Sequence, residues 1–269
     1  MRIKYTEEEL PQGSEEWLRI RRDYGTASEA SSACEVSPWS PKNRYELYQL
    51  KQGDLKVKMN FAMQHGNHYE QEAREAFQNW ANKLYEPCCI ADEVEGLPLM
   101  ASLDGQEVLT GNSILEIKCP LKGNESPLWN TMLEDGELPI QYQLQMTQQM
   151  ILAEVKVCHF WVYCAHTKQG MYREFKLKKK LINQLLEGWK EYFKGTPEPA
   201  ITDVVVEDSD EWNTAAYDWI EAKERANKAT YFLTGARERL IELADGQSRR
   251  GNGALVKIND KGVASVRKC

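Results

Sequence analysis

The feature that most restricts the fold of this 269-residue chain is a change of hydrophobic spacing at Pro87. Before it, residues 61–84 carry apolar side chains at helical spacing, among them Tyr69 and Phe77. After it come short segments bounded by Gly, Pro or Asp, which predict strands of a meander: 88–94, 97–103, 107–109 and 113–119. Alternating helices (124–135, 140–154, 180–194) and strands (155–163, 171–177) follow. This order predicts an α/β fold with a central mixed sheet flanked by helices.

The two ends of the chain differ from this centre. Near the start, Ser14 caps a predicted helix, and a second helix is expected from Ala27 after the interruption at Gly25. We expect a core over residues 1–195, a linker over 196–209 and a helical plus hairpin extension over 210–269. Within the extension we expect one long helix or a helix pair over 210–244, with Gly235 as a possible break, and a hairpin of residues 254–258 and 263–267.

Composition excludes several protein classes. The chain has no stretch of about 18 apolar residues, which a membrane-spanning helix would need, and its start lacks the apolar core of a signal peptide. We therefore expect a cytoplasmic protein. The net charge of −7, from 34 basic and 41 acidic residues, argues against a general polyanion-binding surface but leaves room for a local basic channel.

The 7 cysteines give no motif, because none of them forms a CxxC pair. Reduced thiols in or near the core are the expected state in a cytoplasmic chain. An iron–sulfur cluster is the alternative, since four of these cysteines could converge in space.

The sharpest chemical signal is Asp104, predicted at the end of a strand, followed by Glu116 and Lys118 on another. Residues two apart in a strand point to the same face, so Glu116 and Lys118 project together, and Asp104 can reach them across a hairpin. Carboxylate oxygens select Mg²⁺ or Mn²⁺, and a lysine can support negative charge developing on a phosphodiester. The alternative is a pair of solvent-facing charges, but the apolar neighbours Leu115 and Ile117 favour a half-buried strand.

This core resembles the D…(D/E)-x-K motif of restriction-endonuclease-like nucleases, and more closely the phage lambda exonuclease family, the YqaJ-type viral recombinases. Further motifs similar to that family's occur in its order over about residues 12–195. They are W-x-x-x-R…T-A-S, G-x-x-x-E and Y-x-x-Q, matched here by Trp17 to Ser28, Gly66 to Glu70 and Tyr142 to Gln145. The resemblance implies a restriction-endonuclease-like core.

The resemblance also assigns roles to residues. Asp104, Glu116 and the backbone carbonyl of Ile117 would bind Mg²⁺, with Glu70 as a further ligand or orienting group, and Lys118 would position the attacking water. The family's active-site glutamine corresponds to Gln145, although Gln141, Gln143, Gln148 and Gln149 stand close by. Arg21 and Ser28 match the residues that hold the 5′-terminal phosphate of DNA, with Arg19 and Arg22 as alternatives to Arg21.

The implied function is a metal-dependent 5′-to-3′ exonuclease of phage or prophage origin. It would digest linear double-stranded DNA in a bacterial host and leave single strands for an annealing protein. A ring-shaped homotrimer is the implied assembly, which a particle mass near 31 kDa would contradict. The alternatives are an endonuclease built on the same core, a non-catalytic module that binds DNA ends, and an iron–sulfur nuclease.

Overall fold

The computed structural model describes residues 2–197, 209–259 and 263–268. The chain divides into two compact units, residues 1–201 and 202–269. The linker expected over residues 196–209 lies almost wholly outside the described residues.

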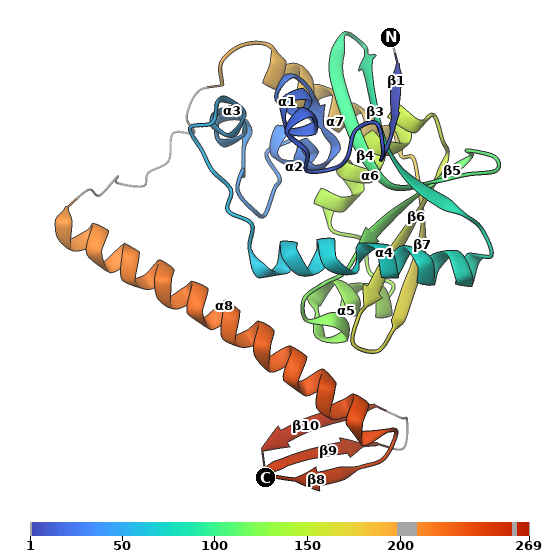
Figure 1. Cartoon of the computed structure of the whole chain (residues 1–269). Coiled ribbons are helices and arrows are strands. Elements are labelled where there is room, and N and C mark those ends of the chain that lie inside the picture. Colours follow the sequence, from blue (N-terminus) through green and yellow to red (C-terminus); the bar gives the residue numbers. More distant parts are fainter. Residues whose placement is uncertain (1, 198–208, 260–262, 269) are drawn as a thin grey trace. The chain divides into compact units, whose positions relative to one another are not determined.

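The first unit alternates helices and strands in the predicted manner (Figure 1). Its helices are α1 (Glu15–Asp23), α2 (Ala30–Ala33), α3 (Arg44–Gln52), α4 (Phe61–Ala81), α5 (Pro127–Leu133), α6 (Ile140–Ala153) and α7 (Lys179–Phe193), with 3₁₀ turns η1 (Ala27–Glu29) and η2 (Gly123–Glu125). Its strands are β1 (Ile3–Thr6), β2 (Gly25–Thr26), β3 (Tyr85–Val94), β4 (Leu97–Glu107), β5 (Ser113–Lys118), β6 (Val157–Cys164) and β7 (Gln169–Lys176).

Local signals set several helix starts. The side chains of Ser14, Asn43, Asn60 and Ser126 each accept a hydrogen bond from the backbone N–H three residues later, at the starts of α1, α3, α4 and α5. Each cap satisfies one of the backbone N–H groups that a helix leaves without an intrahelical partner.

The strands form one mixed sheet in the order β1-β3-β4-β5-β6-β7, and β2 pairs with β4. Neighbours β3, β4 and β5 are antiparallel, whereas β5 and β6 run parallel with Glu116 opposite Phe160. The parallel pair requires a crossover, which η2, α5 and α6 supply. The predicted mixed sheet flanked by helices is confirmed.

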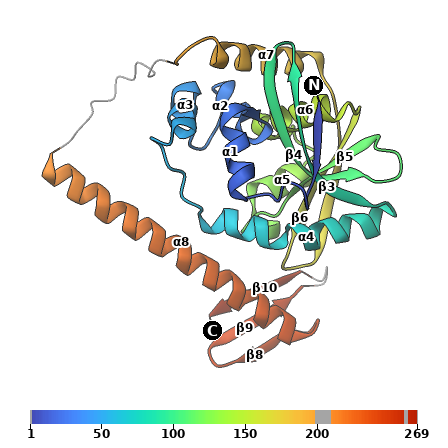
Figure 2. The ribbon, with the colours of Figure 1, turned by 45° about the horizontal axis from the view of Figure 1, so that its top comes forward.

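Helices cover the two faces of the sheet (Figure 1 and Figure 2). On one face, residues of α2, α6 and α7 pack with the strands, and Leu144 and Leu185 are fully buried there. On the other face, Ala73 and Phe77 of α4 pack against Leu115 and Ile117 of β5. The middle of the sheet is therefore buried on both sides, and a charged group there needs a partner.

Two expectations about β4 are wrong. Residues 107–109 do not form a strand of their own, and Asp104 lies inside β4 rather than at its end. Gly105, which follows Asp104 within β4, permits a close approach of β3, because a Cβ there would lie 2.7 Å from the Cβ of Tyr85. The helix expected over 124–135 is also shorter, since it starts at Pro127 after the cap residue Ser126.

The second unit begins with α8 (Asp210–Ala244), one continuous helix of 35 residues without a break at Gly235. A three-stranded antiparallel sheet follows, in the order β10-β9-β8. Its strands are β8 (Arg249–Gly251), β9 (Ala254–Ile258) and β10 (Ala264–Lys268). The predicted hairpin corresponds to β9 and β10, most of its turn lies outside the described residues, and β8 was not predicted.

Across the described part of the chain, no helix has the length and apolar character needed to cross a membrane.

Candidate active site

Asp104 of β4 and Glu116 and Lys118 of β5 meet, as the sequence predicts. The register of the two strands places Gly105 opposite Leu115, which brings Asp104 beside the end of β5. The Asp104 Oδ2 atom accepts a hydrogen bond from the backbone N–H of Ile117 at 2.6 Å. Glu116 is completely buried, and its Oε1 atom forms an ion pair with the Lys118 ammonium.

Helix α6, which packs on one face of the sheet, supplies the side chains that hold Glu116. Gln145 Nε2 donates to Glu116 Oε1 at 2.8 Å, and Gln149 Nε2 donates to Glu116 Oε2 at 2.6 Å. The Lys118 ammonium also donates to Gln145 Oε1 at 3.4 Å and lies 5.3 Å from the centre of the Tyr142 ring. Each carboxylate oxygen of Glu116 thus has its own amide donor, which fixes its orientation.

Gln149 was not singled out by the sequence, although Gln145 was. The two residues are four apart on a helix and therefore share a face. Two other glutamines of the run have partners elsewhere: Gln143 donates to the backbone oxygen of Leu138, and Gln148 to that of Gly25.

Glu70 approaches the site from α4, but through another residue. Its Oε1 atom is paired with the Arg74 guanidinium at 2.7 Å, and Arg74 Nε donates to the backbone oxygen of Asp104 at 2.6 Å. Arg74 was not predicted, and the i, i+4 spacing from Glu70 is the sequence signal that could have found it.

The electrostatics of the site show carboxylates that are crowded together. Removal from water raises the pKa of Asp104 well above its usual value, and the Glu116 and Glu70 carboxylates raise it further. Removal from water also raises the pKa of Glu70. Burial lowers the pKa of Lys118, but the carboxylates of Glu116 and Asp104 outweigh this, and its pKa is raised. Such a cluster favours a bound cation.

The donor set fits a hard divalent cation. Asp104 and Glu116 supply carboxylate oxygens, and the expected third ligand, the backbone carbonyl of Ile117, is also an oxygen. Within the described residues, no three His, Cys, Asp or Glu side chains are grouped to hold a metal ion. Glu70 therefore lies close enough to affect Asp104 electrostatically but is not grouped with the other two carboxylates as a third ligand.

Arg21 and Ser28 also meet. Arg21 Nη2 lies 3.2 Å from Ser28 Oγ and 3.3 Å from Glu29 Oε1, and the guanidinium lies 4.3 Å from the centre of the Trp17 ring. On the far side of Glu29, the buried Lys51 ammonium pairs with Oε2 at 2.7 Å. The Arg21 group therefore consists of Arg21, Ser28, Trp17, Glu29 and Lys51. The sequence did not predict that its last three members belong to it.

Contacts connect this group with the carboxylate site. Trp17 Nε1 donates to Ser102 Oγ at 3.0 Å, and Gln149 Nε2 reaches the backbone oxygen of Ser102 at 3.3 Å. Ser102 precedes Asp104 by two residues on β4. Ser102 of β4 therefore links Trp17 of α1, beside Arg21, to Gln149 of α6 in the carboxylate site.

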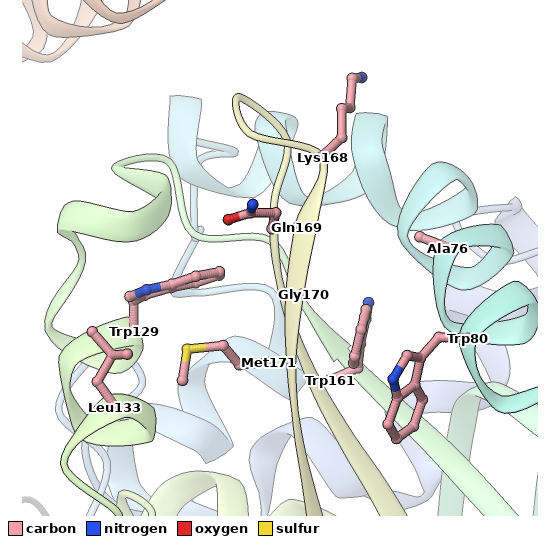
Figure 3. Close-up of a pocket in the computed structure, with 9 residues that line it drawn as sticks. All are labelled: Ala76, Trp80, Trp129, Leu133, Trp161, Lys168, Gln169, Gly170 and Met171. Carbon is pink, nitrogen blue, oxygen red and sulfur yellow. The ribbon is translucent and has the colours of Figure 1, made fainter. Parts of the chain in front are cut away.

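A separate pocket of about 410 Å³ lies around β7 and contains none of the predicted site residues. Trp161 and Trp80 lie on one side of β7, and Trp129 and Leu133 lie on the other (Figure 3). This pocket is mostly apolar, with Lys168 and Gln169 as its polar lining, and carries no carboxylate, so it does not provide the chemistry of the Asp104 site.

The described cysteines are free thiols, and all except Cys34 are buried. Burial raises the pKa of Cys34 and of Cys119 to about 12, and that of Cys89 to about 11. Among the residues that the structure describes, no group of them is arranged to hold a metal ion. Cys269 lies outside the described residues.

The comparisons place this fold among known proteins. The structure shares the fold of an alkaline exonuclease, LHK-Exo from Laribacter hongkongensis, at 22% identity and a TM-score of 0.54, over 67% of this chain and 91% of that one. The structure of LHK-Exo in complex with dAMP matches at 21% identity and a TM-score of 0.55, with the same coverage. The predicted α/β fold, a mixed sheet flanked by helices, is therefore also the fold of these exonuclease structures.

The chain belongs to the YqaJ-like viral recombinase family, whose sequence model matches residues 16–156, just over half of its length. That range contains Asp104, Glu116, Lys118, Gln145 and the Arg21 group. Curated protein sequences give no match. The family assignment made from the sequence motifs is thus confirmed.

Proposed function

We propose that this protein is a metal-dependent 5′-to-3′ exonuclease that digests linear double-stranded DNA. The observation that carries the proposal is the convergence of Asp104, Glu116 and Lys118 at one point of the sheet, with Gln145 bonded to both Glu116 and Lys118. Membership of a viral recombinase family supports it, as does the fold shared with an alkaline exonuclease.

In this proposal Asp104, Glu116 and the backbone carbonyl of Ile117 hold Mg²⁺ or Mn²⁺. The cation supplies positive charge at the scissile phosphodiester and makes a water molecule more acidic. Lys118 orients the attacking water and stabilises negative charge on the phosphate. Gln145 and Gln149 fix the Glu116 carboxylate, which keeps the ligand oxygens in place as the substrate arrives.

The end of the DNA is recognised by the Arg21 group. A guanidinium fork suits a phosphate, and Ser28 Oγ adds a hydroxyl donor beside it. A nuclease that cuts internally has no need of a site for a terminal phosphate, so this group favours exonuclease over endonuclease activity.

The proposal extends to partners. The single strands produced would pass to a single-strand annealing protein in phage-type recombination, in the cytoplasm of a bacterial host. The nuclease core would form a homo-oligomer, for which the family resemblance implies a ring of three chains.

The test uses linear duplex DNA with and without a 5′ phosphate, beside a closed circle, in Mg²⁺ or EDTA. We expect Mg²⁺-dependent loss of the phosphorylated linear DNA, abolished by Lys118→Ala. The matched control is Lys176→Ala, which removes an exposed lysine of β7 and should leave the rate unchanged. Cutting of the circle would instead establish an endonuclease, and no cutting by the wild-type protein would refute the nuclease proposal.

A further inference from the structure

Helix α8 exposes large apolar side chains along its length. Trp212, Trp219 and Leu233 are 58%, 66% and 71% exposed, and Leu243 near the other end is 55% exposed. At about 1.5 Å per residue a helix of 35 residues is about 50 Å long. Apolar surface spread along one helix in this way indicates a binding face.

These residues belong to an unbroken heptad repeat. Apolar residues recur at alternating spacings of three and four, with no polar residue at a core position between Trp212 and Leu243. The a positions are Trp212, Trp219, Ala226, Leu233 and Leu240, and the d positions are Ala215, Ala222, Ala229, Ala236 and Leu243. A repeat sustained over more than three or four heptads is typical of a coiled coil.

The helix's own sheet does not cover this seam. Within the second unit, α8 contacts β9 and β10 near its C-terminal end, where Ala244 is buried. Ala244 occupies an e position, beside the seam. Most of the a and d side chains listed above remain exposed to a second helix.

We propose that α8 pairs with α8 of a second copy of this chain in an antiparallel coiled coil. In an antiparallel pair each a residue faces a d residue, and one register places Ala226 against Ala229 of the second copy. Trp219 then faces Ala236, Leu233 faces Ala222, and Leu240 faces Ala215. In three layers a large side chain thus meets an alanine, which lets the two backbones approach closely. The central layer pairs Ala226 with Ala229, and the outermost layer pairs Trp212 with Leu243.

A parallel pair fits less well. It would place Trp219 against its own copy, and Leu233 likewise, while most d layers would contain only alanines. Layers that are alternately too large and too small leave gaps and strain, both of which cost stability.

The charged residues beside the seam support the same register. In the antiparallel pair the g positions face each other, so Asp218 meets Arg239 of the second copy and Arg225 meets Phe232. The first is an ion pair, and the second is a cation–π pair. Because the pairing is symmetric, each contact occurs twice.

This complementarity of α8 with itself identifies the partner as a second copy. An unrelated partner would not require the large a residues, the d alanines and the g charges of one helix to match one another. Pairing doubles whatever assembly the nuclease core forms: two chains from a monomer, or six from a ring of three. The inference does not depend on the proposed nuclease activity.

The first test measures particle mass by light scattering on the full chain. Trp219→Glu and Leu233→Glu place a charge in the seam, and both positions are exposed, so the fold of the single chain should survive. We expect each variant to halve the mass. Tyr217→Glu is the matched control, because Tyr217 is equally exposed at 66% but lies at an f position away from the seam, and it should leave the mass unchanged.

Three outcomes would overturn the proposal. They are a wild-type mass of a single chain, a mass that neither seam variant lowers, and an equal loss with Tyr217→Glu. Circular dichroism of each variant confirms that helix content is retained in the isolated chain.

The second test fixes the orientation. Asp218→Arg should weaken pairing by about tenfold through repulsion between like charges. Adding Arg239→Asp should restore it if the helices are antiparallel. Restoration by Lys223→Asp instead would show a parallel pair, because Lys223 is the parallel partner of Asp218, and restoration by neither would refute the register.

Discussion

In the proposed 5′-phosphate site, the buried Lys51–Glu29 pair would set the net charge that the side chains around Arg21 present to a phosphate. The Lys51 ammonium lies 2.7 Å from Glu29 Oε2, and the two side chains are only 6% and 9% exposed. Glu29 Oε1 faces Arg21 at 3.3 Å. With Lys51 present, the three groups carry one net positive charge. Without the Lys51 ammonium, the negative charge of the Glu29 carboxylate would cancel the positive charge of Arg21 and would also repel the phosphate.

The size of this effect follows from Coulomb's law. If the Lys51 ammonium and a phosphate bound to Arg21 are taken to lie about 7 Å apart, they interact by about 2 kcal/mol at an effective dielectric constant of about 20. That energy corresponds to a factor of about 30 in an equilibrium constant at room temperature. Stability changes as well, because breaking a buried ion pair by removing one partner costs about 3–5 kcal/mol.

The perturbation is Lys51→Met, compared with the double variant Glu29→Gln/Lys51→Met. The assay is the ratio of digestion rates for linear DNA with and without a 5′ phosphate, which cancels losses of folded protein. Lys51→Met should lower the ratio by about 30-fold, as estimated from the charge separation above. The double variant should recover most of it, because the neutral amide that replaces the Glu29 carboxylate leaves Arg21 its full charge and an oxygen acceptor.

The reasoning is refuted if the double variant is as poor as Lys51→Met. Lys51 would then act by holding the backbone oxygens of Arg21 and Tyr24, to which its ammonium donates at 2.5 and 2.7 Å. Arg21→Ala is the reference for complete loss of preference. A wild-type protein without any preference for the 5′ phosphate would refute the role of the Arg21 group itself.

The same pair predicts a pH dependence of stability. Burial raises the pKa of Glu29, but Lys51 and Arg21 outweigh it, and its pKa lies below the ordinary value of 4.5. A carboxylate whose pKa is lower in the folded state stabilises the protein above the unfolded pKa, and this contribution is lost as the pH falls through the folded value. On urea unfolding, the wild-type protein should lose more stability between pH 7 and pH 3 than the double variant.

Two further predictions concern packing and the carboxylate site. Gly170→Ala should destabilise the core by at least about 2 kcal/mol, because its Cβ would lie 1.8 Å from Trp161 Cζ2. Gly66→Ala in α4, where an added Cβ would have no heavy atom within 4 Å, should raise the free energy of unfolding by about 1 kcal/mol. Urea unfolding of the two variants should therefore show stability changes of opposite sign. Gln149→Leu should lower the nuclease rate by about 10–100-fold, because Glu116 Oε2 loses its donor at 2.6 Å. An unchanged single-turnover rate would contradict that role.

Much of the fold was predictable because its signals are local. Capping residues set several helix starts in the core unit, and the change of hydrophobic spacing predicts the passage from α4 to the strands, although β3 begins at Tyr85, before Pro87. The errors came where a residue type that usually marks the end of a strand is instead required by a contact with a residue distant in sequence. Gly105 resembles a strand boundary in the sequence, but the strand continues and the glycine makes room for Tyr85.

The site divides in the same way. The sequence by itself determined that Glu116 and Lys118 share one face of β5, because side chains alternate along a strand. Only the tertiary structure decided which glutamines of α6 reach Glu116, that Arg74 lies between Glu70 and Asp104, and that Lys51 pairs with Glu29 beside Arg21. Contacts between residues distant in sequence depend on how helices pack across the sheet, and no spacing along the chain encodes that packing.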